Sequence, residues 1–161
     1  MAVAFIALGS NLGDRRTYLT WAVDQIGQLP ETRILRVSSF LETEPIGGPA
    51  QGRYLNGVAT IETRLEPVVL FRHLQKIEVA LGRPKAHPFW GPRIIDLDLL
   101  SYDGLVVDTP ELTLPHPRMH ERNFVLIPLA EIAPDWQHPT FRESVRELLG
   151  KWTDASRPAA E

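Results

Sequence analysis

The chain has 161 residues, a length that suits one compact unit, so we expect residues 1–161 to form a single domain. Hydrophobic residues make up 43% of the chain, which is enough to build a core and excludes an intrinsically disordered protein. The net charge of −3 argues against a general nucleic-acid binder, and the lack of cysteine excludes disulfides, thiol catalysis and cysteine-based metal sites.

The ends of the chain and its apolar stretches bear on localisation. No stretch approaches the ~20 apolar residues of a membrane span, and residues 1–9 lack the positive leader of a signal peptide. We therefore expect a cytoplasmic protein without a membrane partner. Residues 154–161 are small and polar, which predicts a frayed tail.

The first half of the chain alternates apolar runs with turn signals. Residues 2–8 predict a buried strand. Asp14 is a good N-cap for a helix that ends near Gly27. Residues 34–41 and 54–61 predict two further strands, because both segments are rich in β-forming residues.

The second half continues this pattern. Pro67 suits the first turn of a helix that ends at Gly82. Residues 83–92 form a long loop with three prolines, and residues 94–100 alternate strictly between apolar and other side chains, which predicts a fourth strand. The order β-α-β-β-α-β predicts an α+β fold with a ferredoxin-like core, in which helices pack on an antiparallel sheet.

The remaining third of the chain is expected to extend the same domain. A turn at Asp103–Gly104 and a loop through His116 follow the fourth strand. Helical spacing then predicts helices over residues 124–132 and 142–149, which would form a C-terminal helical extension.

Two aspartates lie within the predicted fourth strand. Asp96 and Asp98 share one face of it, about 6.5–7 Å apart by strand rise, while the neighbouring apolar residues face the other way. Two unpaired carboxylates inside an apolar strand would repel one another. A magnesium ion held together with substrate phosphates resolves this repulsion. An ordinary solvent-facing strand is the alternative interpretation.

Cations gather just before these carboxylates. Arg83, Lys85 and Arg93 fall in or next to the proline-rich loop. Phosphoryl transfer needs metal-bound phosphates and nearby cations, and a long loop in a compact domain is typical of a lid. A solvated loop without such a role remains the alternative interpretation of this segment.

Three further patterns point toward ligands less specifically. Tyr54 and Asn56 share one strand face, where an aromatic ring and an amide suit a flat heterocycle, although a strand tyrosine is more often packing. His116 and Arg122 belong to a basic cluster that we expect to contact phosphate. The turn Gly9–Asp14 matches no phosphate-loop motif and is interpreted as structural.

Several motifs occur here in the order known from one enzyme family. They are Gly9–Asp14, Ser39–Pro45, Tyr54–Asn56, Gln75–Glu78, Gly82-Arg83, Trp90–Asp98, and Pro115-His116 with Arg122 and Phe124. The most specific is Gly91-Pro92-Arg93 followed by Asp96 and Asp98. With these residues the chain resembles, nearly end to end, the 6-hydroxymethyl-7,8-dihydropterin pyrophosphokinases of folate biosynthesis.

The resemblance implies an ATP-dependent diphosphotransferase. Such an enzyme moves the terminal pyrophosphate of MgATP to the hydroxymethyl group of the pterin and leaves AMP. It implies two magnesium ions bound by Asp96 and Asp98, and a protein that is usually a monomer. Attack by the substrate hydroxyl needs no protein nucleophile, so catalysis would come from positioning and charge.

The resemblance also implies a role for individual residues. Catalysis is expected from Asp96, Asp98 and the lid residues Arg83 and Arg93. The pterin is expected to contact Thr43, Pro45, Ile46, Gly47, Tyr54, Asn56, Trp90, Asp96 and Phe124. ATP is expected to contact Gln75, Glu78, Lys85, Trp90, Arg93, Leu99, Thr113, His116 and Arg122.

Four residues differ from the family pattern, namely Phe89, Lys85, Glu111 and Pro117, and they affect the expected lid and nucleotide side. Three other functions compete with this interpretation: a catalytically impaired pterin- or nucleotide-binding protein, a ferredoxin-like RNA-binding module, and a metal-dependent phosphohydrolase. The retained carboxylates and arginines argue against the first, the negative net charge against the second, and the small number of metal ligands against the third.

Overall fold

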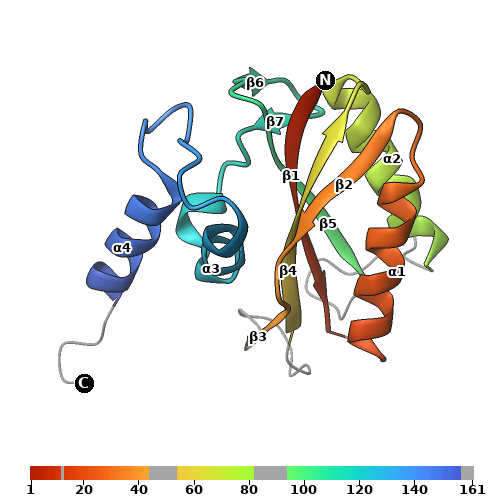
Figure 1. The fold of residues 1–161 in the computed structure, drawn as a ribbon, viewed down its shortest axis with the longest axis horizontal. Coiled ribbons are helices and arrows are strands. Elements are labelled where there is room, and N and C mark those ends of the chain that lie inside the picture. Colours follow the sequence, from red (N-terminus) through yellow and green to blue (C-terminus); the bar gives the residue numbers. More distant parts are fainter. Residues whose placement is uncertain (12, 44–53, 82–93, 157–161) are drawn as a thin grey trace.

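A computed structural model describes residues 1–11, 13–43, 54–81 and 94–156 of the chain (Figure 1). Strands β1 (Ala2–Ser10), β2 (Thr32–Val37), β4 (Tyr54–Thr63) and β5 (Asp96–Tyr102) form an antiparallel sheet in the order β2-β4-β1-β5. This is the strand order of a ferredoxin-like sheet, so the predicted fold class is confirmed.

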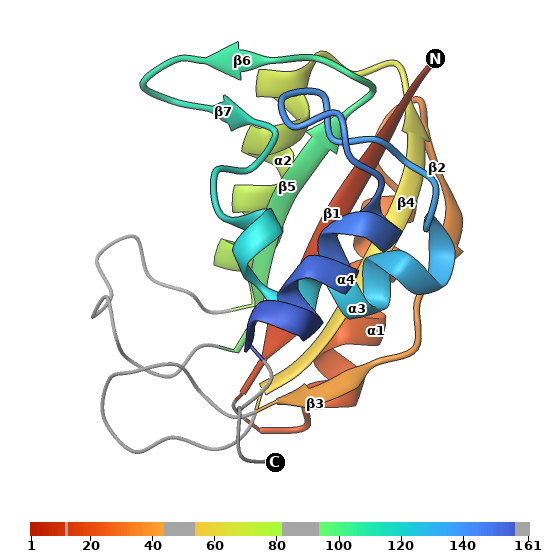
Figure 2. The same ribbon diagram turned by 90° about the vertical axis from the view of Figure 1, so that its left-hand side faces the viewer.

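Helices cover both faces of the sheet. Helices α1 (Arg15–Gly27) and α2 (Pro67–Ala80) cover one face, and α3 (Asn123–Ile132) and α4 (Val145–Ser156) lie on the other side (Figures 1 and 2). Alternate residues of β1 face the two layers. Ile6 and Leu8 belong to the core beneath α1 and α2, whereas Phe5 and Ala7 belong to the core beneath α3 and α4.

The predicted strand over residues 34–41 is wrong in its extent, because the chain forms two strands there. After β2 the regular ladder ends, although the Ser38 N–H still donates to the Val58 carbonyl at 2.9 Å, and β3 (Leu41–Thr43) then pairs with the beginning of β4. Ser38 causes the break because its Oγ accepts the Val58 N–H, 2.9 Å away, and donates to the Ser39 carbonyl, 2.8 Å away. The separate β3 brings Thr43 alongside Tyr54.

The segment after β5 contains a hairpin that the sequence did not predict. Strands β6 (Val107–Asp108) and β7 (Thr113–Leu114) pair with one another where a loop was expected. Two-residue strands are too short to show an alternating pattern, which is why sequence reasoning missed them. The 3₁₀ helix η1 (Met119–Glu121) then leads into α3.

The predicted N-cap of α1 is confirmed. The Asp14 carboxylate accepts hydrogen bonds from the Thr17 N–H at 3.3 Å and from Thr17 Oγ1 at 2.8 Å, and these bonds lower the pKa of Asp14. At the other end, α4 extends to Ser156, so the first three residues of the predicted frayed tail are helical. Among the described residues, no helix is long and apolar enough to cross a bilayer.

Candidate active site

The two aspartates of β5 have the predicted orientation. Leu97 and Leu99 are buried in the core beneath α1 and α2, whereas Asp96 and Asp98 are only half-buried on the opposite face. In the register with β1, Asp96 lies opposite Gly9 and Asp98 lies opposite a small alanine. Both carboxylates therefore lie on the side of the sheet that faces α3 and α4.

Gly9 joins these aspartates to the predicted pterin residues. On its other side Gly9 pairs with Asn56, so Asn56, Gly9 and Asp96 form one row across the sheet. A Cβ atom on Gly9 would lie 2.9 Å from Asn56 Oδ1 and 3.8 Å from Tyr54 Cδ1. Both of these side chains therefore lean over Gly9, on the sheet face that carries the aspartates. Sequence reasoning placed Gly9 only in a structural turn and missed this role.

Asn56 is held in place by a neighbouring strand. Its Nδ2 donates to Thr43 Oγ1 at 2.7 Å, and the side chain is buried. Thr43 in turn lies opposite Tyr54 in the β3–β4 pairing. Three of the residues expected to contact the pterin thus form one connected group. The others on the β3–β4 connection, Pro45, Ile46 and Gly47, lie outside the described residues.

The start of α3 brings a cation and an aromatic ring to the same face. Arg122 precedes the helix, and its Nη1 lies 3.7 Å from Asp98 Oδ2. The Arg122 guanidinium also lies 5.7 Å from the centroid of the Phe124 ring. Phe124 is half-buried against the core beneath α3. Among the described residues Arg122 is thus the cation that pairs with the Asp98 carboxylate.

His116 lies next to this pair and is positioned by main-chain contacts. Its N–H donates to the Leu100 carbonyl at 2.8 Å, and its Nδ1 accepts the Arg118 N–H at 3.2 Å. Burial lowers the pKa of His116, and the charges of Arg122 and Arg118 lower it further, while Asp98 opposes them. A neutral imidazole that accepts at Nδ1 carries its proton on Nε2, which leaves a donor for a ligand oxygen.

Glu78 has a structural contact that the sequence did not reveal. Its Oε2 accepts the Leu97 N–H at 2.8 Å, between the two aspartates in sequence, and so ties α2 to the edge of β5. Gln75, on the same helix, and Thr113, on β7, have exposed side chains. The Leu99 side chain is 3% exposed in the core, so only its main chain can reach a ligand.

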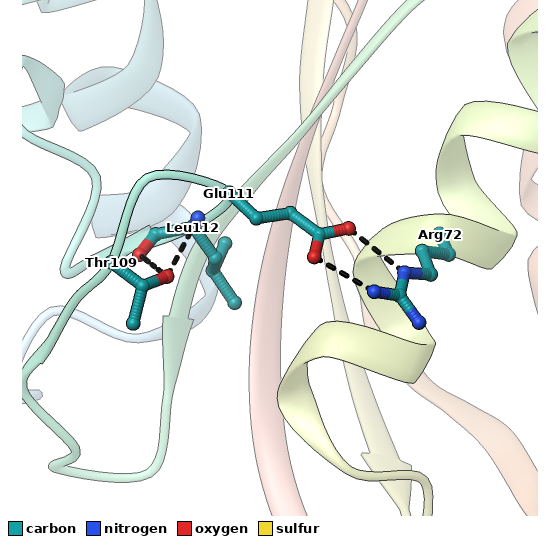
Figure 3. A network of polar contacts seen from close by, with 4 residues as sticks. All are labelled: Arg72, Thr109, Glu111 and Leu112. Atoms are coloured by element: carbon teal, nitrogen blue, oxygen red, sulfur yellow. Dashed lines mark hydrogen bonds and ion pairs between the residues drawn. The ribbon is translucent and has the colours of Figure 1, made fainter.

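Glu111, one of the four departures from the family pattern, has a cationic partner. It accepts two hydrogen bonds from Arg72 of α2, from Nε and from Nη2, each 2.8 Å long (Figure 3). Thr109 stabilises the same turn, because its Oγ1 accepts the Leu112 N–H at 3.0 Å. The pairing raises the pKa of Arg72 and lowers that of Glu111. The hairpin is thereby linked to α2.

The predicted lid spans residues 83–92, between two described segments of the chain. Arg83, Lys85, Trp90 and Arg93 lie outside the described residues, as does Phe89. The described part of the chain holds no group of three or more histidines and carboxylates that could bind a metal ion. Two half-buried aspartates fit magnesium nonetheless, since this ion commonly takes one or two carboxylates and completes its shell with phosphates and water.

The family model for 7,8-dihydro-6-hydroxymethylpterin-pyrophosphokinase (HPPK) matches residues 5–134. The chain belongs to the HPPK family. The match covers the sheet from residue 5 onward and η1–α3, and thus all described residues of the candidate site.

Curated relatives agree with the family match. The chain is 43% identical to 2-amino-4-hydroxy-6-hydroxymethyldihydropteridine pyrophosphokinase of Bacillus subtilis over 155 residues, which covers 96% of this chain and 92% of the relative. Its counterpart in Pseudomonas aeruginosa is 44% identical over 90% of this chain and 88% of its own length. The chain also matches 20% of the Folic acid synthesis protein fol1 of Schizosaccharomyces pombe, with 40% identity.

Solved structures of two-part HPPK-DHPS proteins share the fold. The wild-type protein of Plasmodium falciparum aligns with a TM-score of 0.78 and 13% identity, over 97% of this chain. An HPPK-DHPS in complex with substrates aligns with a TM-score of 0.75. The chain spans less than half of those proteins, 45% and 44% respectively, and at such low identity the likeness concerns the HPPK fold alone.

Proposed function

We propose that this HPPK-family chain transfers the terminal pyrophosphate of MgATP to the hydroxymethyl group of 6-hydroxymethyl-7,8-dihydropterin, giving AMP and the pterin diphosphate in folate biosynthesis. The observation that carries the proposal is the row Asn56–Gly9–Asp96. These residues lie on three adjacent strands, β4, β1 and β5, and the row supports a heterocycle-binding amide at one end and a phosphate-side carboxylate at the other. A substrate that spans the row has its ring at one end and its reacting hydroxyl at the other.

The pterin lies, in this proposal, over Gly9 and against Tyr54 and Phe124. An aromatic ring favours stacking with a flat heterocycle. Asn56 reads the ring edge through hydrogen bonds, and its bond to Thr43 fixes the orientation of the amide. The lack of a side chain on Gly9 leaves the room that the ring needs. Pro45, Ile46, Gly47 and Trp90 complete the pterin contacts.

The triphosphate lies on the β5 side of the row. Asp96 and Asp98 would hold two magnesium ions, and such ions would supply positive charge that neutralises the phosphate oxygens. Arg122 and His116 contact the phosphates from the start of α3 and from the preceding loop, because one supplies a charged fork and the other a neutral Nε2–H donor. Gln75, Glu78, Leu99 and Thr113 lie on the nucleotide side.

The reaction requires no protein nucleophile. The substrate hydroxyl attacks the β-phosphorus of ATP, its proton leaves, and the bond to the α-phosphate oxygen breaks to release AMP. The residues contribute by aligning both substrates and by balancing charge that develops in the transition state. In this proposal Arg83, Lys85 and Arg93 are the cations of the lid. The lid excludes water from the site when it closes.

The proposal also covers the oligomeric state, the location and the partners of the protein. We propose a cytoplasmic monomer of one domain, without membrane or nucleic-acid partners. Its edge strand β2 supports a monomer, since it carries Arg33 and Arg36 and a register shift against β4. Charges and irregularities of this kind discourage pairing between sheet edges of two copies.

The test is incubation with MgATP and 6-hydroxymethyl-7,8-dihydropterin, followed by separation of the nucleotides. We expect AMP and the pterin diphosphate in equal amounts, and neither without the pterin. ADP would indicate transfer of a single phosphoryl group, and free pyrophosphate would indicate hydrolysis; either result would overturn the proposal. Pterin binding without any AMP would favour a catalytically impaired pterin-binding protein.

A further inference from the structure

Helix α3 carries two side chains on one stripe that have different partners. Phe124 lies at its first turn, and Glu131 follows seven residues later, which is two helical turns and nearly the same direction. Phe124 belongs to the proposed pterin site. Glu131 lies at the far end of the helix and takes no part in the proposed chemistry.

Glu131 binds the connection between β2 and β3. Its Oε2 accepts the backbone N–H of Ser39 at 2.8 Å and the Ser39 hydroxyl at 3.2 Å. The two residues are 92 positions apart in sequence, so this contact joins the C-terminal helical layer to the first half of the chain. A carboxylate that accepts two hydrogen bonds forms a stronger contact than a neutral acceptor would.

The connection that Glu131 binds is itself fixed to β4. The Ser38 N–H donates to the Val58 carbonyl at 2.9 Å, and the Val58 N–H donates to Ser38 Oγ at the same distance. The Phe40 ring covers Gly57 so closely that a Cβ there would lie 2.7 Å from Phe40 Cδ1. Because this connection is tightly packed against β4, a shift of α3 is expected to shift β3 as well.

The other end of this connection is the pterin edge. It continues directly into β3, whose Thr43 accepts the hydrogen bond of Asn56. Helix α3, in turn, contains Pro128. Proline has no N–H to donate to the carbonyl four residues earlier, which belongs to Phe124, and this weakens the helix at that residue.

From these contacts we infer that Glu131 is a positioning residue for the pterin, because it fixes the spacing between the Phe124 wall on α3 and the Thr43–Asn56 edge of the sheet. The inference rests on the proposed function. Glu131 does not touch the substrate; it acts through Ser39 and β3. Its loss is expected to loosen the pterin site more than the nucleotide side, because most of the proposed ATP contacts lie on α2, β5 and β7, and of them only Arg122 adjoins α3.

The experiment compares Glu131→Ala, Glu131→Gln and Ser39→Ala with the wild type, whose AMP production is established first. Loss of a charged acceptor with two donors should raise the pterin KM of Glu131→Ala about tenfold. The ATP KM and the kcat at saturating pterin should stay within about twofold. Glu131→Gln keeps one acceptor oxygen and should restore most of the pterin KM, while Ser39→Ala should raise it about threefold.

Asp135→Ala is the matched control, since this acidic residue just beyond α3 is 85% exposed and should leave both KM values unchanged. A wild-type pterin KM in folded Glu131→Ala overturns the inference, as does an equal rise in both KM values, which indicates a general loss of structure. If Glu131→Ala does not fold, Ser39→Ala decides: an unchanged pterin KM there overturns it. Absence of AMP from the wild type contradicts the proposed function instead.

Discussion

The Glu78 carboxylate of α2 accepts the Leu97 N–H of β5, with 2.8 Å between Oε2 and the nitrogen. Leu97 separates the two aspartates in sequence, so the helix holds the strand at the point where the carboxylates emerge. The bond also joins the two ends of the segment that contains the predicted lid.

Glu78→Ala is expected to destabilise the fold and impair ATP use. The loss of a charged hydrogen bond to a partly buried N–H should lower the free energy of unfolding by about 1–3 kcal/mol. The ATP KM should rise more than the pterin KM, because β5 carries the proposed metal ligands Asp96 and Asp98. Urea unfolding and steady-state kinetics measure the two effects. An ATP KM equal to that of the wild type in Glu78→Ala would show that β5 does not depend on this contact.

Asp98→Asn is expected to abolish pyrophosphate transfer while pterin still binds in a binary complex. The amide has the shape of the carboxylate but lacks the charge that pairs with Arg122 and that is proposed to hold magnesium. Turnover should fall by at least about 100-fold, the order found when one electrostatic contributor to a transition state is removed. Full activity in this variant would refute the metal assignment, and pterin fluorescence titration checks the binary complex.

Gly9→Ala is expected to impair the pterin side selectively. Its Cβ would lie 2.9 Å from Asn56 Oδ1, so the amide must move, and such overpacking costs about 1–3 kcal/mol. The pterin KM should therefore rise at least about tenfold, with a smaller change in the ATP KM. Gly104→Ala is the matched control, because a Cβ there meets no atom within 4 Å. Equal effects of the two substitutions on pterin KM would contradict the proposed position of the ring.

Glu111→Ala is expected to strengthen ATP binding. Glu111 lies two residues before the predicted nucleotide contact Thr113. In the wild type its carboxylate neutralises the charge of Arg72. Without Glu111 the guanidinium is available to the phosphates, which should lower the Kd for ATP by about twofold to fivefold at low salt. The gain should shrink at high salt and vanish in the double variant Arg72→Ala/Glu111→Ala. Titration calorimetry at two salt concentrations measures the Kd for ATP of each variant. If the tighter binding persists in the double variant, the Arg72 guanidinium is not its cause.

His138 is expected to make the stability of the C-terminal layer depend on pH. The side chain is buried, its Nδ1 accepts the N–H groups of Thr140 and Phe141 at 3.2 Å each, and the Phe141 ring stacks on it with centroids 4.5 Å apart. Burial lowers the pKa of His138, nearby His120 lowers it further, and Glu143 opposes them.

Because the folded pKa lies below the unfolded value of about 6.5, the stability from neutral His138 is complete above that pH. It is lost as the pH falls from about 6.5 through the folded pKa. His138→Asn keeps an acceptor oxygen without titrating, so its unfolding free energy should fall less between pH 7 and pH 5. Urea unfolding across this range measures the difference; parallel curves for the two proteins would exclude His138 as the source.

Local patterns explain most of what could be predicted. The alternation around Asp96 and Asp98 gave their common face, because successive side chains of a strand point to opposite sides whatever the rest of the fold does. Asp14 was recognisable as a cap for the same reason, since its partner, Thr17, lies three residues away. By contrast, the break at Ser38 depends on Val58, twenty residues further along the chain, and no local pattern signals it.

The residues of the candidate site illustrate the same division. Tyr54, Asn56, Arg122 and Phe124 were expected to bind ligands, and the structure brings them to one face of the sheet. It also gave contacts that were not foreseen, such as the bond of Glu78 to β5 and the pairing of Glu111 with Arg72. Each joins segments that are distant in sequence, and its geometry depends on how whole helices pack against the sheet.

The sequence of one strand therefore determined the shared face of Asp96 and Asp98, and the order of elements along the chain predicted the fold class. What only the tertiary structure decided is what stands beside them: Gly9 and Asn56 in one row, and Arg122 at the start of α3. The register between strands and the placement of a helix depend on the combined packing of many residues far apart in the chain. No single segment of the sequence therefore predicts them.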